Sequence, residues 1–399
     1  MLWPRLFAAP RLRSYGGNKN VKPSVILAYM VRRNSHRLAL KAQIDQLIKT
    51  SREVVKDCAL ENGAIVAVNI DKSYVHREAA NYRWVWPRDA AFVCVAADIL
   101  KIPIQKPFFQ WLEEYPQDFA RRGILYANYA TNGRIGSMGT TFQPDQSGAV
   151  LWAVYHHYQK DLKKALEFKD LIEQLANGLV NYWDKTCFSI HTVDIWEETH
   201  RHTSATMENN FTYSLAACAR GLLLACEILS NSIWKKVAEQ MIEQIKRAYH
   251  KKNQYFYRMF GRINDKNVDA SLLGLSWPFE IYDPKSEEMI NMIKKIEEKI
   301  VINGGVHRYQ FDYYDGEGSA QEGGGVWPVL NFWLAIVWFL AGDKTKALNY
   351  YLWVLRRLNQ DGYKDYIPEQ IFDDFRKGIY PLAWSHSMFV IASHYLGYI

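Results

Sequence analysis

The chain has 399 residues, 49% of them hydrophobic, which is enough apolar material to form a large buried core. Its net charge of +7 is concentrated at the start, because residues 1–40 contain eight Lys or Arg and no acidic residue. The rest of the chain has 41 basic against 42 acidic residues and no basic face for a phosphate backbone, so we expect no nucleic-acid partner. No apolar run reaches the roughly 18 to 20 residues that span a bilayer, so we expect no membrane partner.

Residues 1–40 are interpreted as a basic N-terminal tail or leader. A transit-like peptide, a solvated tail and a misassigned start all fit their composition, and no secretory pattern with a cleavage site is visible. The five cysteines are odd in number and form no CxxC pair, which predicts buried free thiols in a reducing compartment and hence a cytoplasmic location. No cluster of His and Cys has the spacing of a zinc site, and we expect neither a metal ion nor a cofactor.

Helical periodicity dominates the chain from residue 40 onward. Apolar stripes with the spacing of one helix face follow in order over residues 44–58, 168–182, 289–300 and 348–358. Asp283 and Pro284 are predicted to be the N-cap and first turn of the third of these helices. Ala64 to Ile70 is the best candidate for a strand. In all, helices are predicted to start near residues 40, 88, 105, 146, 166, 211, 231, 269, 284, 324, 343 and 380.

Twelve helices with short links can form six hairpins arranged in a ring. The predicted fold is therefore all-α, an (α/α)6 barrel over residues 41–399. A solenoid would also use helix pairs, but it needs a repeating sequence unit, and we find none. Polar and aromatic motifs recur about every second helix, and every second connection of such a ring lies at the same end. The following motifs are therefore predicted to converge on one mouth: Trp86–Asp89, Gln143–Asp145, Trp196–Glu198, Ser276–Pro278, His307–Tyr309 and Pro368–Gln370.

Two carboxyl groups from different loops are the candidates for chemistry. Hydrolysis of a sugar acetal needs one carboxylic acid to protonate the leaving oxygen and one carboxylate to activate water or to attack directly. Glu197 fits the acid, because the adjacent Trp196 and the like charge of Glu198 favour a raised pKa. Taken alone, this acidic pair also fits a solvated loop. Glu369 fits the second role, while Glu322 in another loop is an alternative whose polarity needs no catalytic explanation.

Aromatic and charged residues also alternate before the second predicted helix. Tyr82, Trp84 and Trp86 surround Arg88 and Asp89, and sugar sites combine flat aromatic faces with charged hydrogen-bonding groups in this way. The 14 Trp residues of the chain are a high number, which favours a carbohydrate site. Core packing is the alternative for most of them, including Trp152, Trp183 and Trp333.

In order and spacing, these motifs resemble the glucoamylase family, glycoside hydrolase family 15, and most of all its bacterial and archaeal members. The resemblance runs from about residue 40 to the C-terminus. It rests on Asn-Gly-Ala-Ile-Val-Ala at 62–67, Trp-Pro-Arg-Asp at 86–89, Gln-Pro-Asp at 143–145 with Gly148, Ile-Trp-Glu-Glu at 195–198, Asp-Ala-Ser-Leu-Leu at 269–273, His-Arg-Tyr at 307–309, Glu-Gln at 369–370 and Leu-Ala-Trp-Ser-His at 382–386.

The resemblance implies an (α/α)6 barrel that hydrolyses α-linked glucosides from the non-reducing end with inversion. By position, Glu197 matches the general acid and Glu369 the general base. Arg88 and Asp89 match the pair that holds the terminal glucose, and Glu198 and Arg308 match further sugar-binding positions. The expected aromatic contacts to substrate are Tyr82, Trp86, Trp196 and Trp384.

Two departures from the family pattern affect the expected substrate, an oligosaccharide or disaccharide. Many relatives carry a β-sandwich before the barrel, whereas only about forty residues precede it here. The stretch from Thr199 to Asn210 also diverges, so we expect it to shape the acceptor side. Maltooligosaccharides, isomaltose-type linkages and trehalose all stay open as substrates, and the sequence does not indicate an oligomeric state.

Other functions on the same fold are less well supported. A non-catalytic carbohydrate sensor should have lost one carboxylate, whereas both Glu197 and Glu369 are present. A phosphorylase would lack the base at residue 369, because phosphate itself attacks the sugar.

Overall fold

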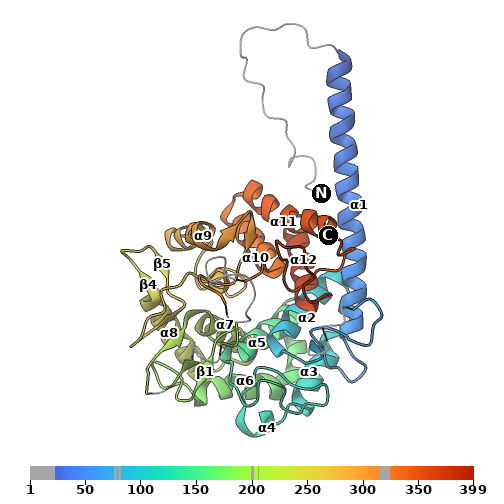
Figure 1. Ribbon diagram of the computed structural model, residues 1–399. Coiled ribbons are helices and arrows are strands. Elements are labelled where there is room, and N and C mark those ends of the chain that lie inside the picture. Colours follow the sequence, from blue (N-terminus) through green and yellow to red (C-terminus); the bar gives the residue numbers. More distant parts are fainter. Residues whose placement is uncertain (1–22, 76–78, 80–81, 199–201, 205, 314–323) are drawn as a thin grey trace.

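The computed structural model describes residues 23–75, 79, 82–198, 202–204, 206–313 and 324–399, with side chains from Leu38 onward (Figure 1). The described part is mainly helical. In chain order its helices are α1 (Pro23–Cys58), α2 (Pro87–Leu100), α3 (Gln105–Glu114), α4 (Phe119–Arg122), α5 (Pro144–Tyr158), the 3-10 helix η2 (Leu162–Phe168), α6 (Lys169–Asn181), α7 (Thr212–Leu229), α8 (Ser232–Ala248), the 3-10 helix η3 (Ala270–Leu275), α9 (Glu287–Ile300), α10 (Pro328–Ala341), α11 (Lys344–Gln360) and α12 (Ala383–Tyr395).

Six of these elements form a closed inner ring. Neighbours pack against one another in the order α2, α5, α7, η3, α10 and α12, and α12 closes the ring on α2. Each inner element follows a helix of the outer layer, which consists of α1, α3, α6, α8, α9 and α11 (Figure 1). The predicted (α/α)6 barrel is therefore confirmed, although the inner element expected near residue 269 is a short 3-10 helix.

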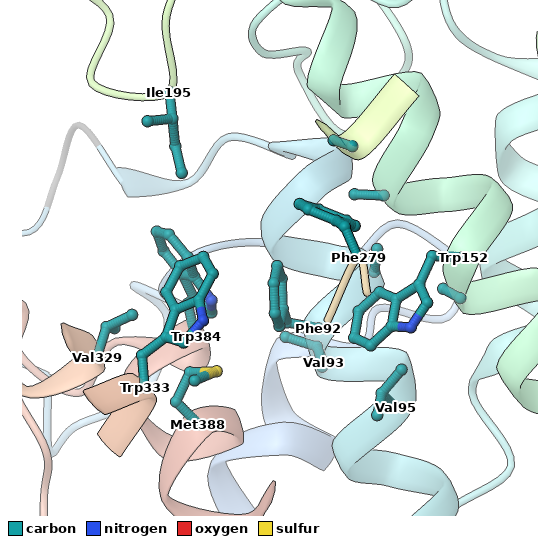
Figure 2. Packing of buried hydrophobic residues seen from close by; sticks show 14 of the residues in the cluster. Phe92, Val93, Val95, Trp152, Ile195, Phe279, Val329, Trp333, Trp384 and Met388 are labelled. Carbon is teal, nitrogen blue, oxygen red and sulfur yellow. The ribbon is translucent and has the colours of Figure 1, made fainter. Parts of the chain in front are cut away.

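The inner helices are apolar on nearly all sides because they are covered both by the outer layer and by each other. Figure 2 shows the centre of this core, where Phe92 of α2 lies between tryptophans of other helices. Its ring centroid is 5.0 Å from that of Trp152 on α5 and 5.6 Å from that of Trp384 on α12. Trp152, Trp183 and Trp333 are all buried, as the core-packing alternative predicted.

Close helix packing explains one glycine of the sequence motifs. A Cβ atom at Gly148 of α5 would lie 2.3 Å from the backbone oxygen of Ala217 on α7. The two helix backbones therefore touch at this point, and no side chain fits between them.

Helix α7 is long and apolar enough to cross a membrane, but two thirds of its residues are buried inside the protein, as in the core helix of a barrel.

The strands are short, and each antiparallel pair joins two loop segments. They are β1 (Thr192–Val193), β2 (His202–Thr203), β3 (Asn210–Phe211), β4 (Tyr249–His250), β5 (Tyr255–Phe256), β6 (Met259–Phe260), β7 (Val301–Ile302) and β8 (Gly305–Val306). They pair antiparallel as β1 with β2, β3 with β6, β4 with β5 and β7 with β8. The β1–β2 pair encloses the loop that carries Glu197.

Three local predictions are wrong. The first helix begins at Pro23 rather than near residue 40, so α1 runs through that position as one helix. The segment from Ala64 to Ile70 is not a strand. Its apolar residues are largely buried in the core. Within the segment only Ile65 forms an isolated β-bridge, with Ala59.

The third wrong prediction concerns the start of α9. The N-cap is Ser286, whose hydroxyl accepts a hydrogen bond from the backbone N–H of Met289, whereas Asp283 accepts one from Lys285 in the preceding turn.

All five cysteines are free, and only Cys226 is not fully buried, as expected for buried thiols.

Candidate active site

A cavity of about 810 Å³ opens at the N-terminal ends of the inner-ring helices. Residues at the start of α2, immediately before α10 and at the start of α12 meet there with residues of the loops that connect the helices. The predicted convergence of the motifs on one mouth is thus largely confirmed. Nine of the ten predicted site residues line the cavity: Tyr82, Trp86, Arg88, Asp89, Trp196, Glu197, Arg308, Glu369 and Trp384.

Glu197 is largely withdrawn from solvent and lines the cavity beside α2. Trp86, the N-cap residue of α2, donates a hydrogen bond from its Nε1 to Glu197 Oε1 at 2.6 Å. Burial raises the pKa of Glu197 to about 7, while Arg88 and the Trp86 hydrogen bond oppose this rise. Glu197 can therefore hold a proton near neutral pH, as a general acid must.

The like charges that raise the pKa of Glu197 further are those of Asp89 and Asp145. The sequence had indicated Glu198 for this role. The Glu198 carboxylate instead points into a separate buried ion cluster, where it pairs with Arg258 at 2.7 Å.

Glu369 lies on the same cavity and comes from the loop between α11 and α12. Its backbone N–H donates to the carbonyl of Ile379 at 2.8 Å, which joins the two ends of the segment from Glu369 to Ile379. The hydroxyl of Tyr82 donates to Glu369 Oε2 at 2.7 Å and orients the carboxyl group. Tyr82 is itself placed by the buried 64–70 segment, because its carbonyl accepts a hydrogen bond from Val68.

Arg88 and Asp89 are charged groups of the first turn of α2 at the cavity wall. Arg88 Nε donates to Asp89 Oδ1 at 3.1 Å, and Arg88 Nη1 donates to Asp145 Oδ2 at 3.2 Å. Asp145 is completely buried at the start of α5, so the Gln143–Asp145 motif supports Arg88 from behind. Burial raises the pKa of Asp89, and the Arg88 guanidinium opposes this rise. The guanidinium also lies 5.4 Å from the ring centroid of Trp384.

Arg308 is another charged residue that lines the cavity. Its guanidinium donates to both carboxylate oxygens of Asp312, at 2.5 and 2.9 Å, and lies 4.9 Å from the ring centroid of Trp327. Trp196 is fixed by a hydrogen bond from its Nε1 to Asp269 Oδ2 at 2.9 Å. Sequence reasoning missed Trp327, although Trp327-Pro328 repeats the Trp86-Pro87 pattern at the start of another inner helix.

Among the described residues, Glu198, Trp277 and the Gln143–Asp145 motif do not line the cavity. Glu198 is 2% exposed and does not line it. Trp277 also lies away from it, because it follows the inner element η3 instead of preceding one, and its Nε1 donates to Tyr395 at the end of α12. Glu322 lies outside the described residues.

One wall of the cavity is built by a loop of which the sequence singled out only Glu369 and Gln370. Residues of the loop that follows Glu369 line the cavity, namely Gln370, Phe372, Arg376, Lys377, Gly378 and Ile379. The Arg376 guanidinium lies 3.9 Å from the ring centroid of Phe372. By contrast, the described residues of the divergent 199–210 stretch do not line the cavity, contrary to expectation.

The raised pKa of Glu197 predicts a pH-dependent stability effect. Between pH 4.5 and about 7 the folded protein keeps a proton that the unfolded chain has lost, so stability falls as pH rises through this window. Glu197→Gln removes this penalty, which is about 3 kcal/mol above pH 7 at about 1.4 kcal/mol per pKa unit. Its thermal midpoint should exceed that of the wild type at pH 8, and the gain should shrink at pH 5.

The control for this comparison is Glu298→Gln. Two lysines hold the pKa of exposed Glu298 at about 2, so its replacement should give no gain at pH 8. A Glu197→Gln gain that does not change with pH would contradict the buried, proton-holding state of Glu197.

Comparison with known proteins agrees with the geometry. Residues 113–370 match the family model described as "Glycosyl hydrolases family 15". An uncharacterized glycosyl hydrolase of Methanocaldococcus jannaschii is 29% identical over 359 residues, which cover 84% of this chain and 53% of that protein. The isomaltose glucohydrolase of Kribbella flavida is 25% identical over 70% of this chain and 71% of its own length. Trehalase 1 of Sulfolobus acidocaldarius is 22% identical over 78% of this chain and 56% of its own length.

The alignments thus span little more than half the length of the first and third of these relatives. Solved structures support the fold. A wild-type glycosidase superposes with a TM-score of 0.72 at 22% identity, covering 90% of this chain and 99% of its own. A bacterial glucoamylase complexed with acarbose superposes with a TM-score of 0.66 at 18% identity, covering 88% of this chain and 55% of its own.

Proposed function

The chain belongs to glycosyl hydrolases family 15, and from this premise we propose that it is an inverting, exo-acting α-glucoside hydrolase that releases β-glucose from short α-glucans. The observation that carries the proposal is the presence on one cavity of two carboxyl groups in different surroundings. Glu197 is largely buried and has a pKa raised to about 7, and Glu369 is held by the Tyr82 hydroxyl. Two carboxyl groups with divided roles are what glycoside hydrolysis requires.

In the proposed reaction, the Glu197 carboxyl group donates its proton to the glycosidic oxygen as the bond from this oxygen to the anomeric carbon breaks. Glu369 accepts a proton from a water molecule, whose oxygen attacks the anomeric carbon from the opposite face. Glu197 then carries the negative charge and Glu369 the proton, and exchange with solvent restores both. Inversion requires room for this water, with the two carboxyl groups roughly 6.5–9.5 Å apart.

The charged residues of the first turn of α2 support an exo mode of action. Arg88 is held by Asp89 and the buried Asp145, so its guanidinium is fixed before substrate arrives. Fixed charged groups make strong, directional hydrogen bonds to hydroxyls, and leaving them unpaired is costly. A terminal glucose bound by Arg88 and Asp89, against the Trp384 ring, would orient the scissile bond toward Glu197 and Glu369.

The loop after Glu369 is proposed to contact the leaving group and to set the substrate preference. It lines the cavity with the Phe372 ring and the Arg376 guanidinium, the two kinds of group that sugars bind. Arg357 holds this loop through Asp373 at 2.9 Å and through the Phe372 carbonyl at 2.9 Å. Isomaltose and trehalose stay candidates beside maltooligosaccharides, because relatives with these two activities are similar over most of the chain.

The two carboxyl groups should be separable by mutation. Glu197→Gln removes the proton donor and Glu369→Gln removes the base, so each should lower kcat by roughly 10²–10⁴-fold. Glu322→Gln, the other acidic loop position, should lower kcat far less. Steady-state kinetics on maltose, isomaltose and trehalose measure these effects. Little loss in Glu369→Gln combined with a large loss in Glu322→Gln would reverse the assignment of the base.

The proposed acceptor loop predicts a different kind of effect. Phe372→Ala and Arg376→Gln should change the ratio of kcat/KM between maltose, maltotriose, isomaltose and trehalose by about tenfold, the value of one directed contact of about 1.4 kcal/mol. Asp89→Ala should instead lower kcat/KM for all four substrates, because they share the terminal glucose. Phe375→Ala is the matched control, since Phe375 belongs to the same loop but is 65% exposed and does not line the cavity. Unchanged ratios in both cavity-lining variants would exclude this loop as the acceptor site.

A further inference from the structure

A buried ion cluster lies behind the loop that carries Glu197. At its centre is Arg258, which immediately precedes β6, and Arg258 does not line the cavity. Its Nη2 pairs with Asp194 and, at 2.7 Å, with Glu198 Oε2, and its Nε lies 3.0 Å from Asp269 Oδ2. The four side chains are at most 4% exposed. Such a cluster is costly to bury unless every charge is paired, so its geometry is strongly constrained.

The two loop residues that Arg258 binds stand on either side of the candidate acid. Asp194 precedes Glu197 by three residues and Glu198 follows it directly. Asp194 also shapes the turn between them. Its Oδ1 accepts from the backbone N–H of Trp196 at 3.1 Å, and its backbone carbonyl accepts from that of Glu197 at 3.2 Å. One guanidinium therefore fixes both ends of the turn that presents Glu197.

This turn needs external support because its backbone is unfavourable. Glu197 has a φ of 63°, in the left-handed region that residues with a Cβ adopt at a cost of about 1 kcal/mol or more. Such a conformation persists only where the surroundings enforce it. The hydrogen bond from Trp86 fixes the end of the Glu197 side chain, but it does not fix the backbone.

The same cluster also connects the turn to other walls of the cavity. Asp269 accepts hydrogen bonds from Trp196 Nε1 and pairs with Arg258. The Tyr309 hydroxyl donates to Glu198 Oε1 at 2.5 Å, and the Tyr309 ring lies 4.0 Å from the Arg258 guanidinium. Tyr309 adjoins Arg308, which lines the cavity.

We propose that Arg258 is a positioning residue of the reaction, which holds Glu197 in place by clamping Asp194 and Glu198. The proposal rests on the proposed function of Glu197 as the general acid. It also gives Glu198 a role different from the sugar contact that its motif implied, since Glu198 acts through the clamp and not on the substrate. Displacement of a reacting group by about 1 Å can cost about 10²-fold in rate.

The test uses two substrates that differ in their need for an acid. A disaccharide leaves as a poorly stabilised alkoxide and needs the proton of Glu197, whereas fluoride leaves α-glucosyl fluoride with little help from an acid. Arg258→Lys keeps the charge but loses the forked geometry that binds two carboxylates at once. We expect kcat for the best disaccharide substrate to fall by about 10- to 100-fold with little change in KM, and kcat for α-glucosyl fluoride to fall by less than about threefold.

Two further variants separate positioning from general destabilisation. Arg220→Lys alters another arginine ion pair, with Glu280, on a helix away from the cavity, and it should show no selectivity between the two substrates. Glu198→Gln retains the pairs of Arg258 with Asp194 and Asp269. It should therefore fold even if Arg258→Lys does not, and it should show the same selective loss at smaller size.

The outcomes distinguish the clamp from the proposed function itself. Equal loss on both substrates, or no loss, in Arg258→Lys and Glu198→Gln would overturn the clamp and leave the proposed function intact. A wild-type protein that hydrolyses neither substrate would overturn the proposed function and the clamp with it.

Discussion

The burial of one carboxyl group governs the arrangement of this site. A carboxylic acid in water has lost its proton at neutral pH, so an acid that must keep it has to be withdrawn from solvent. In this chain the withdrawal of Glu197 raises its pKa to about 7. The neighbouring groups then have to stabilise a side chain and a backbone conformation that the protein would otherwise avoid. Trp86 binds the carboxyl group, and Arg258 fixes the turn from behind.

The barrel makes such burial possible because it separates two kinds of charge. Arg88, Asp89 and Glu369 face the cavity, where a sugar can bind them. Asp145, Asp194, Glu198 and Asp269 lie behind them and are paired with arginines. The N-termini of α2, α10 and α12 meet at the cavity, so residues at the starts of three helices reach one small volume. The same ring buries the tryptophans around Phe92, and Trp384 belongs both to this core and to the cavity wall (Figure 2).

Much of this arrangement could be predicted from the sequence. Apolar stripes with the helical period predicted the ring, and the recurrence of polar motifs predicted most of the cavity residues, whereas Trp384 was expected only from the family resemblance. Where a motif failed, the reason lies in contacts between distant segments. Glu198 looks like a second acid of the site, but Arg258, sixty residues later in the chain, turns it inward. Trp277 looks like part of a loop motif, but it follows an inner element and lies at the other end of the ring.

The cavity-lining residues from Phe372 to Ile379, in the loop after Glu369, were missed for a related reason, because neither the periodicity nor the composition of the loop marks it as a wall of the cavity. In the proposed mechanism, Glu197 and Glu369 act on opposite faces of the sugar with a water molecule between them. The most direct measurement is proton NMR of the first product released from an α-glucoside, before mutarotation. Initial appearance of β-glucose is the predicted result, and initial appearance of α-glucose would contradict the division of roles between the two carboxyl groups.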